Sequence, residues 1–286
     1  MRQDQITYDD FRANQKSFSS REGIIKYIDR GEGPVILLLH GVPTSGWLYR
    51  KMIDPIVDKG YRVIAPDMLG FGNSESPKGY KIYSESSHAE RLIALMDHLK
   101  IESWTHVMHD AGGLWTWELI KRQPERVKNL IVLNTIIYEE GFKPPVRFMP
   151  GFIARATMWV YRNGITTNSM LKGLFNEGMT VNTLNQEDIE GYKRPLKEGK
   201  TRAMYYFFTR TCNALPDYQE MIQKFEVPAM VVWGKNDSFL KWSPQEEAVT
   251  RDLSIDASQV HLLDAKHFIQ EEHPDELVRL ITSFLE

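Results

Sequence analysis

The chain has 286 residues, of which 42% are hydrophobic and 26% are charged, a composition typical of one large globular domain or of a domain with an insertion. The net charge of -3 argues against a nucleic-acid partner and against a polybasic membrane patch. The single cysteine, Cys212, excludes an intrachain disulfide, and no Cys and His cluster has zinc-like spacing. We therefore expect no metal site.

The N-terminus is polar, and no apolar run approaches the roughly 18 residues that can cross a bilayer. These features predict a soluble cytoplasmic protein with no membrane partner. The sequence makes no prediction of oligomeric state.

Strands and helices alternate along the first half of the chain. Residues 15–29 predict a hairpin, and the apolar run Val35–Leu39 predicts a central strand. Apolar residues at helical spacing predict helices. This alternation indicates an α/β fold with a mostly parallel sheet. Further strands are expected at 61–66, 104–108 and 130–133, with helices at 48–59, at 84–99 and after residue 112.

The alternation stops after residue 139. Residues 140–218 lack a strong strand-like run and are rich in Met, Phe and Tyr, which favours a helical insertion. Strands are expected again at 229–233 and 260–263, with helices near 244–251 and at 274–285. The predicted domains are therefore a core formed by residues 1–139 and 219–286 and a helical cap formed by residues 140–218.

Residues 105–113, T-H-V-M-H-D-A-G-G, have the pattern of a nucleophile elbow. An apolar strand ends at Asp110, and small residues lead directly into a helix. In such a turn the central side chain projects from the sheet, because small neighbours allow a strained backbone. Taken alone, the stretch also fits an aspartate that caps the helix.

Polar residues follow other predicted strands as well, namely His40, Asp237 and His267. Reactive groups collect outside the carboxyl ends of strands in open α/β sheets. The chain order of Asp110, Asp237 and His267 is nucleophile, acid and histidine, which is the order of the α/β-hydrolase triad.

The sequence thus resembles the α/β-hydrolase superfamily over nearly its whole length, and within it the aspartate-nucleophile branch of epoxide hydrolases and haloalkane dehalogenases. The resemblance implies an α/β-hydrolase fold with a mostly parallel central sheet flanked by helices and a helical cap, a small-molecule substrate and no cofactor. The matching motifs are H-G-V-P-T-S-G-W-L-Y-R at 40–50, D-M-L-G-F-G-N-S at 67–74, H-D-A-G-G at 109–113, W-G-K-N-D at 233–237 and K-H-F-I-Q-E-E-H-P-D-E at 266–276.

A carboxylate nucleophile can displace a leaving group from a saturated carbon and form an alkyl ester with the enzyme. His267, held by Asp237, would then act as the general base on the water that hydrolyses this ester. Backbone N–H groups of Val42 and Ala111 would hold the oxyanion of that step. The sequence therefore predicts a hydrolase that acts through an ester at Asp110.

The leaving group separates the two related activities. Dehalogenases of this kind typically donate to the halide from a tryptophan directly after the nucleophile, whereas Ala111 here has no side-chain donor. Epoxide hydrolases supply a proton from tyrosines of the cap, where the candidates are Tyr161, Tyr205 and Tyr206. Tyr205 and Tyr206 are adjacent and would point about 100° apart in a helix, so at most one is expected to face the site.

Epoxide hydrolase is the preferred function. Haloalkane dehalogenase is the alternative, and a noncatalytic ligand-binding member of the fold is the second alternative. Trp47 and Asn134 are further candidates for the substrate pocket, although core packing is the ordinary role of such a tryptophan. Asn134 resembles a position where some dehalogenases keep the triad acid, but Asp237 is preferred because an amide cannot stabilise an imidazolium by charge.

Overall fold

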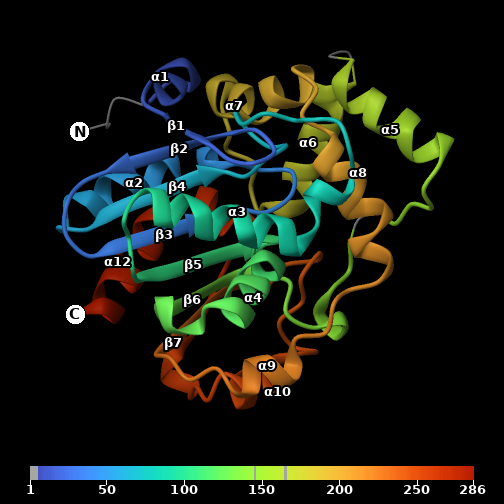
Figure 1. The fold of residues 1–286 in the computed structure, drawn as a ribbon. Helices are drawn as coiled ribbons and strands as arrows, with labels where there is room; N and C mark the ends of the chain where they lie inside the picture. Colours follow the sequence, from blue (N-terminus) through green and yellow to red (C-terminus); the bar gives the residue numbers. More distant parts are fainter. Residues whose placement is uncertain (1–5, 145, 164–165) are drawn as a thin grey trace.

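The computed structural model describes residues 6–144, 146–163 and 166–286. Its centre is an eight-stranded sheet with the order β1-β2-β4-β3-β5-β6-β7-β8 (Figure 1). β1 and β4 pair antiparallel with β2, and the remaining neighbours are parallel. The strands are β1 (Lys16–Ser19), β2 (Ile24–Arg30), β3 (Val35–Leu39), β4 (Arg62–Asp67), β5 (Trp104–Asp110), β6 (Val127–Thr135), β7 (Ala229–Gly234) and β8 (Val260–Leu263).

The central strands explain the apolar runs of the sequence. β5 and β7 are buried along their whole length, and so are residues 36–39 of β3. A strand covered on both faces carries no alternation of apolar and polar residues, which is why these segments are continuously apolar. The edge strand β1 is instead mostly exposed. The mostly parallel sheet predicted from the sequence is confirmed.

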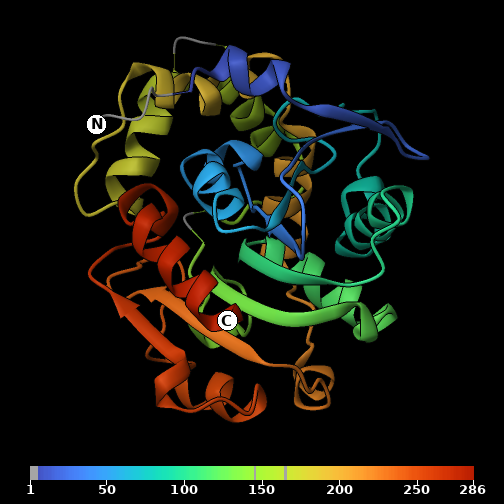
Figure 2. The same ribbon diagram turned by 90° about the vertical axis from the view of Figure 1, so that its left-hand side faces the viewer.

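Helices cover both faces of this sheet. α2 (Arg50–Val57) packs with α12 (Pro274–Leu285) on one face, and α3 (Glu85–His98) packs with α4 (Gly112–Arg122) on the other (Figure 2). Their ends follow from local chemistry. The Ser84 hydroxyl accepts the Ser87 N–H and begins α3, and Pro274 begins α12 at a position where its missing N–H costs nothing.

Of the described helices between β6 and β7, the four longest, here called the insertion helices, lie beyond one end of the sheet (Figure 1). They are α5 (Phe152–Arg162), α6 (Thr167–Gly178), α7 (Gln186–Lys197) and α8 (Arg202–Thr209). The described part of the chain between β6 and β7 contains no strand. The insertion helices follow β6 in the chain and lie at the carboxyl end of β5, where the site forms.

The remaining elements are short. None of the described helices is long and apolar enough to cross a membrane. The short α-helices are α1 (Tyr8–Ala13), α9 (Gln219–Gln223), α10 (Glu246–Asp252) and α11 (Ile269–Glu272), and the 3-10 helices are η1 (Gly46–Tyr49), η2 (Lys81–Tyr83), η3 (Pro124–Arg126), η4 (Glu139–Gly141), η5 (Thr211–Asn213) and η6 (Ala257–Gln259).

Candidate active site

Asp110 ends β5 in a strained backbone conformation. Its φ is 52°, a left-handed value that non-glycine residues rarely adopt and that occurs where the surrounding structure enforces it. The Asp110 carbonyl accepts hydrogen bonds from the Ile136 N–H at 3.1 Å and from the Thr135 hydroxyl at 2.6 Å. These two bonds hold the turn, and the side chain projects beyond the sheet.

The space around Asp110 is too small for side chains at two neighbouring glycines. A methyl group on Gly41 would lie 2.3 Å from the Asp110 carboxylate, and one on Gly112 would lie 2.7 Å from the His40 carbonyl oxygen. Both distances are shorter than real Cβ contacts. The glycines of the H-G-V-P and D-A-G-G motifs therefore let the two loops approach the carboxylate.

The Asp110 carboxylate is held from one side by backbone N–H groups. Val42 donates to its Oδ1 atom at 2.6 Å, and the Ala111 N–H also hydrogen-bonds the carboxylate. Burial raises the pKa of Asp110 above its ordinary value, while the His267 charge and these two N–H groups oppose that rise. Oδ1 thus occupies a site built for a negatively charged oxygen.

His267 lies between Asp110 and Asp237. Its Nδ1 atom is 2.9 Å from Asp237 Oδ2, and its Nε2 atom is 3.7 Å from Asp110 Oδ2. Burial alone would lower the pKa of His267, but the charge and hydrogen bond of Asp237, together with the charge of Asp110, raise it above its ordinary value. An Nδ1–H that donates to Asp237 leaves Nε2 free to accept a proton.

Asp237 is itself fixed. Its Oδ1 atom accepts from the Phe239 N–H at 2.8 Å and from the Leu240 N–H at 3.0 Å. On its Oδ2 atom, the Asn134 Nδ2–H donates at 2.7 Å. These three hydrogen bonds hold the carboxylate in place, so this acid is arranged to orient His267.

A small cavity of about 50 Å³ lies over these residues. Its walls are apolar, and Tyr161 of α5 is the one polar side chain other than Asp110 and His267 among the described residues that line it. The apolar lining consists of Val42, Pro43, Phe142, Pro144, Leu174, Met204, Phe207, Phe208, Phe239, Leu240 and Phe268.

This arrangement agrees with comparisons to known proteins. The family profile described as alpha/beta hydrolase fold matches residues 34–274. The chain belongs to the alpha/beta hydrolase fold family. It is 30% identical over 272 residues to a haloalkane dehalogenase of Mycolicibacterium paratuberculosis, covering 90% of this chain and 86% of that protein. It is 27% identical to a cis-3-alkyl-4-alkyloxetan-2-one decarboxylase of Shewanella oneidensis, covering 95% and 88%.

Solved structures show the same fold. An epoxide hydrolase from Vigna radiata superposes with a TM-score of 0.74 at 22% identity, covering 95% of this chain and 97% of that one. A haloalkane dehalogenase from Bradyrhizobium elkani gives 0.73 at 22% identity, covering 94% and 96%. With its 30% identity to a haloalkane dehalogenase, the chain is an α/β-hydrolase enzyme of the dehalogenase-like branch, and the noncatalytic alternative has no support.

Two of the cap tyrosines predicted as proton donors lie outside the cavity of this α/β hydrolase. On α8, Met204, Phe207 and Phe208 face the cavity, so Tyr205 and Tyr206 are turned away from it by the helical period. Tyr205 stacks on Tyr80 with ring centroids 4.5 Å apart, and Tyr206 lines a separate hollow near Glu85 and Arg210. The structure therefore does not bring Tyr205 or Tyr206 to the cavity, whereas Tyr161 does line it.

Trp47 and Asn134, predicted as possible pocket residues, do not line the cavity either. Trp47 is fully buried, packs edge-on against Tyr8 and Phe11, and donates its Nε1–H to the Asp188 carbonyl at 3.0 Å. The Asn134 side chain lies behind the acid, where it donates to Asp237 and accepts the Gly234 N–H at 2.9 Å.

Two groups that hold the loop of His267 were not predicted from the sequence. The Gly178 carbonyl at the end of α6 accepts both the His267 N–H at 2.9 Å and the Phe268 N–H at 3.0 Å. His109 donates from Nε2 to the His267 carbonyl at 3.0 Å, and the two rings lie 4.6 Å apart. The only feature of the sequence that could have indicated His109 is its position directly before the nucleophile. No sequence feature indicates Gly178, because every residue type has a backbone carbonyl.

A buried ionic cluster joins the insertion helices to the core. Arg50 of α2 forms ion pairs with Glu271 of α11 and Asp188 of α7, and all three side chains are buried. Lys51 and the Tyr192 hydroxyl also contact the Glu271 carboxylate. This cluster fixes α11, which begins two residues after His267, against α7.

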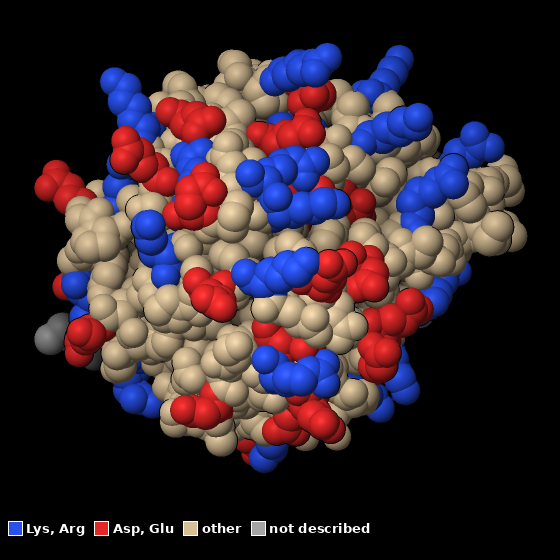
Figure 3. Space-filling model, turned by 60° about the horizontal axis from the view of Figure 1, so that its bottom comes forward, with Lys and Arg blue, Asp and Glu red and all other residues tan. Residues whose placement is uncertain are grey.

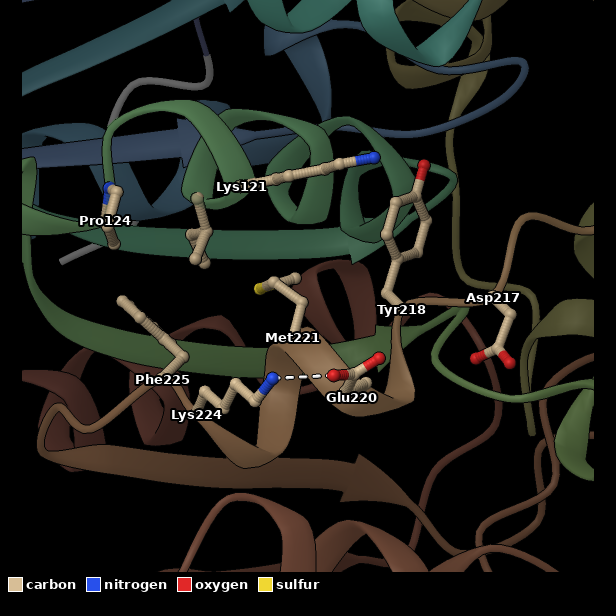
Figure 4. A pocket seen from close by; sticks show the side chains of 9 residues that line it. Lys121, Pro124, Asp217, Tyr218, Glu220, Met221, Lys224 and Phe225 are labelled. Carbon is tan, nitrogen blue, oxygen red and sulfur yellow. Dashed lines mark hydrogen bonds and ion pairs between the residues drawn. The ribbon is translucent and has the colours of Figure 1, made fainter.

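A larger hollow of about 470 Å³ lies elsewhere, between α4 and α9 (Figure 4). It is lined by charged and apolar side chains that include the ion pair of Lys224 and Glu220, both largely exposed. No triad residue lines it, so it is not the active site. Among the described residues, no group of His, Cys, Asp and Glu side chains is placed to hold a metal ion.

Proposed function

We propose that this α/β hydrolase acts on a small apolar substrate by attack of Asp110 on an sp3 carbon, with an epoxide as the preferred substrate. The observation that carries the proposal is that the two carboxylate oxygens of Asp110 have different partners. Oδ1 is held by the Val42 N–H, while Oδ2 faces His267 and the carboxylate lines the cavity. Oδ2 is therefore the attacking atom.

In the first half-reaction, Asp110 Oδ2 forms a bond to one epoxide carbon and the ring C–O bond breaks. The electron pair of that bond goes to the ring oxygen, which becomes an alkoxide and takes a proton. Tyr161 is the donor, because it is the cavity's remaining polar side chain. Burial raises the pKa of Tyr161 above its ordinary value, so its hydroxyl is protonated at neutral pH and can give its proton to a strongly basic alkoxide.

In the second half-reaction, His267 Nε2 takes a proton from a water molecule, and the resulting hydroxide adds to the ester carbonyl carbon of Asp110. The negative charge that forms on Oδ1 is held by the N–H groups of Val42 and Ala111. The bond between the Asp110 carboxyl carbon and Oδ2 then breaks, and the leaving alkoxide takes the proton of the added hydroxyl, so that the diol leaves and one carboxylate oxygen of Asp110 now comes from water. The proton held by His267 returns through solvent to the Tyr161 phenolate, which closes the cycle.

Formation of the ester also activates the base. The Asp110 charge contributes to the raised pKa of His267. Alkylation removes that charge, so the pKa of His267 falls toward its ordinary value and the imidazole becomes neutral at lower pH. The neutral base is thus made available at the step that uses it.

Haloalkane hydrolysis is the second candidate, and the 30% identical dehalogenase relative favours it. Attack by Asp110 would be the same, but a departing halide needs hydrogen-bond donors rather than a proton. The described cavity lining contains no tryptophan or asparagine side chain, so a halide would find one side-chain donor, the Tyr161 hydroxyl. This lining favours the epoxide.

The test is a panel of short-chain epoxides and haloalkanes, with an oxetan-2-one added because of the decarboxylase relative. Diol formation and halide release are measured in parallel. We expect diol, and halide release without diol would reverse the preference. With a substrate so identified, His267→Gln should accumulate an alkyl adduct on the Asp110 peptide, seen by mass spectrometry, while Asp110→Asn should form none. The absence of any adduct in His267→Gln would refute the ester mechanism.

A further inference from the structure

The outer face of α5 exposes large apolar side chains to solvent. Phe152, Ile153 and Trp159 are 78%, 72% and 63% exposed, and Met149 just before the helix is 80% exposed. Phe152 and Trp159 are two turns apart and share one side of the helix. The opposite side holds the buried Ala154 and Met158 and the cavity residue Tyr161. α5 therefore has one apolar face toward the core and a second toward water, which calls for a partner.

The stretch of chain that carries this face is rich in positive charge, although one of its arginines, Arg147, pairs with Glu139 just before it. Residues 141–176 contain five basic side chains, Lys143, Arg147, Arg155, Arg162 and Lys172, and no Asp or Glu. At the right of Figure 3, where α5 projects in Figure 1, a largely uncharged lobe carries blue side chains along it. The overall charge of -3 alone predicts no membrane patch, but the positive charge of this stretch is local.

A hollow of about 250 Å³ beside α5 gathers three arginines. Arg155 and Arg162 of α5 and Arg202 of α8 line it together with Tyr80, Trp159 and Thr201. No carboxylate is among its described lining residues, and none of the three arginines forms an ion pair with a described residue. Arginine side chains bind phosphate groups through several N–H donors, so the hollow suits a phosphate headgroup.

We propose that the outer face of α5 and this arginine hollow form a docking surface for a bilayer of anionic phospholipids. Phe152, Ile153 and Trp159 would enter the headgroup and acyl boundary, and the arginines would contact lipid phosphates, which is how amphipathic helices lie on membranes. A second copy of this chain fits less well, since a two-fold interface would place the cationic surface against itself. The face is also a projecting helix, which a bilayer accepts without a complementary groove.

The proposal is independent of the reaction at Asp110, although it would bring membrane-dissolved apolar compounds to the helix that carries Tyr161. It can therefore be tested by binding alone. Of the seven tryptophans, the other six, Trp47, Trp104, Trp115, Trp117, Trp233 and Trp242, are buried, whereas Trp159 is exposed. The emission of Trp159 is thus a local probe of the surface.

The experiment mixes the full-length protein with vesicles of phosphatidylcholine alone or of phosphatidylcholine and phosphatidylglycerol in equal amounts. We expect co-sedimentation with the anionic vesicles, a blue shift of Trp159 emission, and weaker binding at higher salt. Arg155→Gln should weaken binding about fivefold, and Phe152→Ser with Ile153→Ser should weaken it at least about tenfold. Matched controls at distant exposed sites, Leu262→Ser and Lys121→Gln, should bind as the unchanged protein does.

Several results would overturn the proposal. One is failure to bind anionic vesicles, and another is binding that the Phe152 and Ile153 substitutions leave unchanged. If the protein does not bind vesicles but self-associates, and these substitutions abolish the self-association, the surface is an interface between copies of the chain. Thermal stabilisation by inorganic phosphate that matches the effect of vesicles and is lost in Arg155→Gln would instead identify a free-phosphate site.

Discussion

The buried cluster of Arg50 and Glu271 gives a quantitative prediction about stability. Glu271→Gln removes a carboxylate that accepts two hydrogen bonds from Arg50, and leaves that buried guanidinium with Asp188 as its carboxylate partner. Breaking one side of a buried ion pair typically costs about 3–5 kcal/mol. Because Asp188 remains, we expect the low end, about 3 kcal/mol, which lowers the melting temperature of a chain of this size by roughly 6–12 °C.

The assay is thermal and urea unfolding of Glu271→Gln, Arg50→Met and the double variant. The double variant should lose less stability than the sum of the single variants, because it leaves no unpaired buried charge. Glu220→Gln, which breaks the exposed pair with Lys224, is the matched control and should show no measurable change.

The effect should also depend on pH. Burial opposes ionisation of Glu271, but the charges of Arg50 and Lys51 outweigh burial and lower its pKa below its ordinary value. A carboxyl group with a lowered folded-state pKa stabilises the protein above its unfolded-state pKa of about 4.3, and this stabilisation is lost as the pH falls through the folded-state value. A Glu271→Gln variant as stable as the unchanged protein at neutral pH, or strictly additive losses in the double variant, would refute the reasoning.

Three further predictions concern the catalytic residues. Asn134→Asp should lower turnover by about tenfold or more and raise the pH at which activity appears, because a second carboxylate beside Asp237 raises the pKa of His267 further; a pH–rate profile checks this. His109→Leu should lower the rate of ester hydrolysis more than ester formation, since it frees the His267 carbonyl, and His109→Gln should restore part of the rate in rapid-mixing measurements. The hydrolysis step should have a lower midpoint pH than the His267 titration of the free enzyme followed by NMR, because alkylated Asp110 carries no charge; coincident midpoints would contradict the proposed activation.

Much of the fold could be predicted from the sequence where one pattern dominated. The run Val35–Leu39 became β3 and residues 260–263 became β8, with the predicted bounds. The closing helix at 274–285 was also placed correctly, since Pro274 and the amphipathic pattern mark it clearly. β5 and β6 proved longer than expected. Their C-terminal ends include the polar residues His109, Asp110, Asn134 and Thr135, and β6 also begins three residues earlier, at Val127.

The three triad residues were predictable from their order along the chain. The elbow pattern and the strand ends pointed to Asp110, Asp237 and His267, and in the structure both carboxylates lie within 4 Å of the His267 ring, at 3.7 and 2.9 Å. The direction of Tyr205 and Tyr206 was not predictable, because it depends on which face of α8 packs over the core. Trp47 was equally ambiguous, since a tryptophan beside a catalytic motif can point into either of two apolar regions.

The hydrogen bonds of the Gly178 carbonyl link substrate binding to the position of His267. The cavity of about 50 Å³ is far below the roughly 300–1,000 Å³ of ordinary ligand pockets, so we expect the residues that line it to rearrange when most substrates bind. An outward movement of α6 in that rearrangement would withdraw the acceptor shared by the His267 and Phe268 amides. We therefore expect the enzyme to bind substrate in one conformation and to react in another. The measured KM would then contain the equilibrium between them as well as the contacts of the bound substrate.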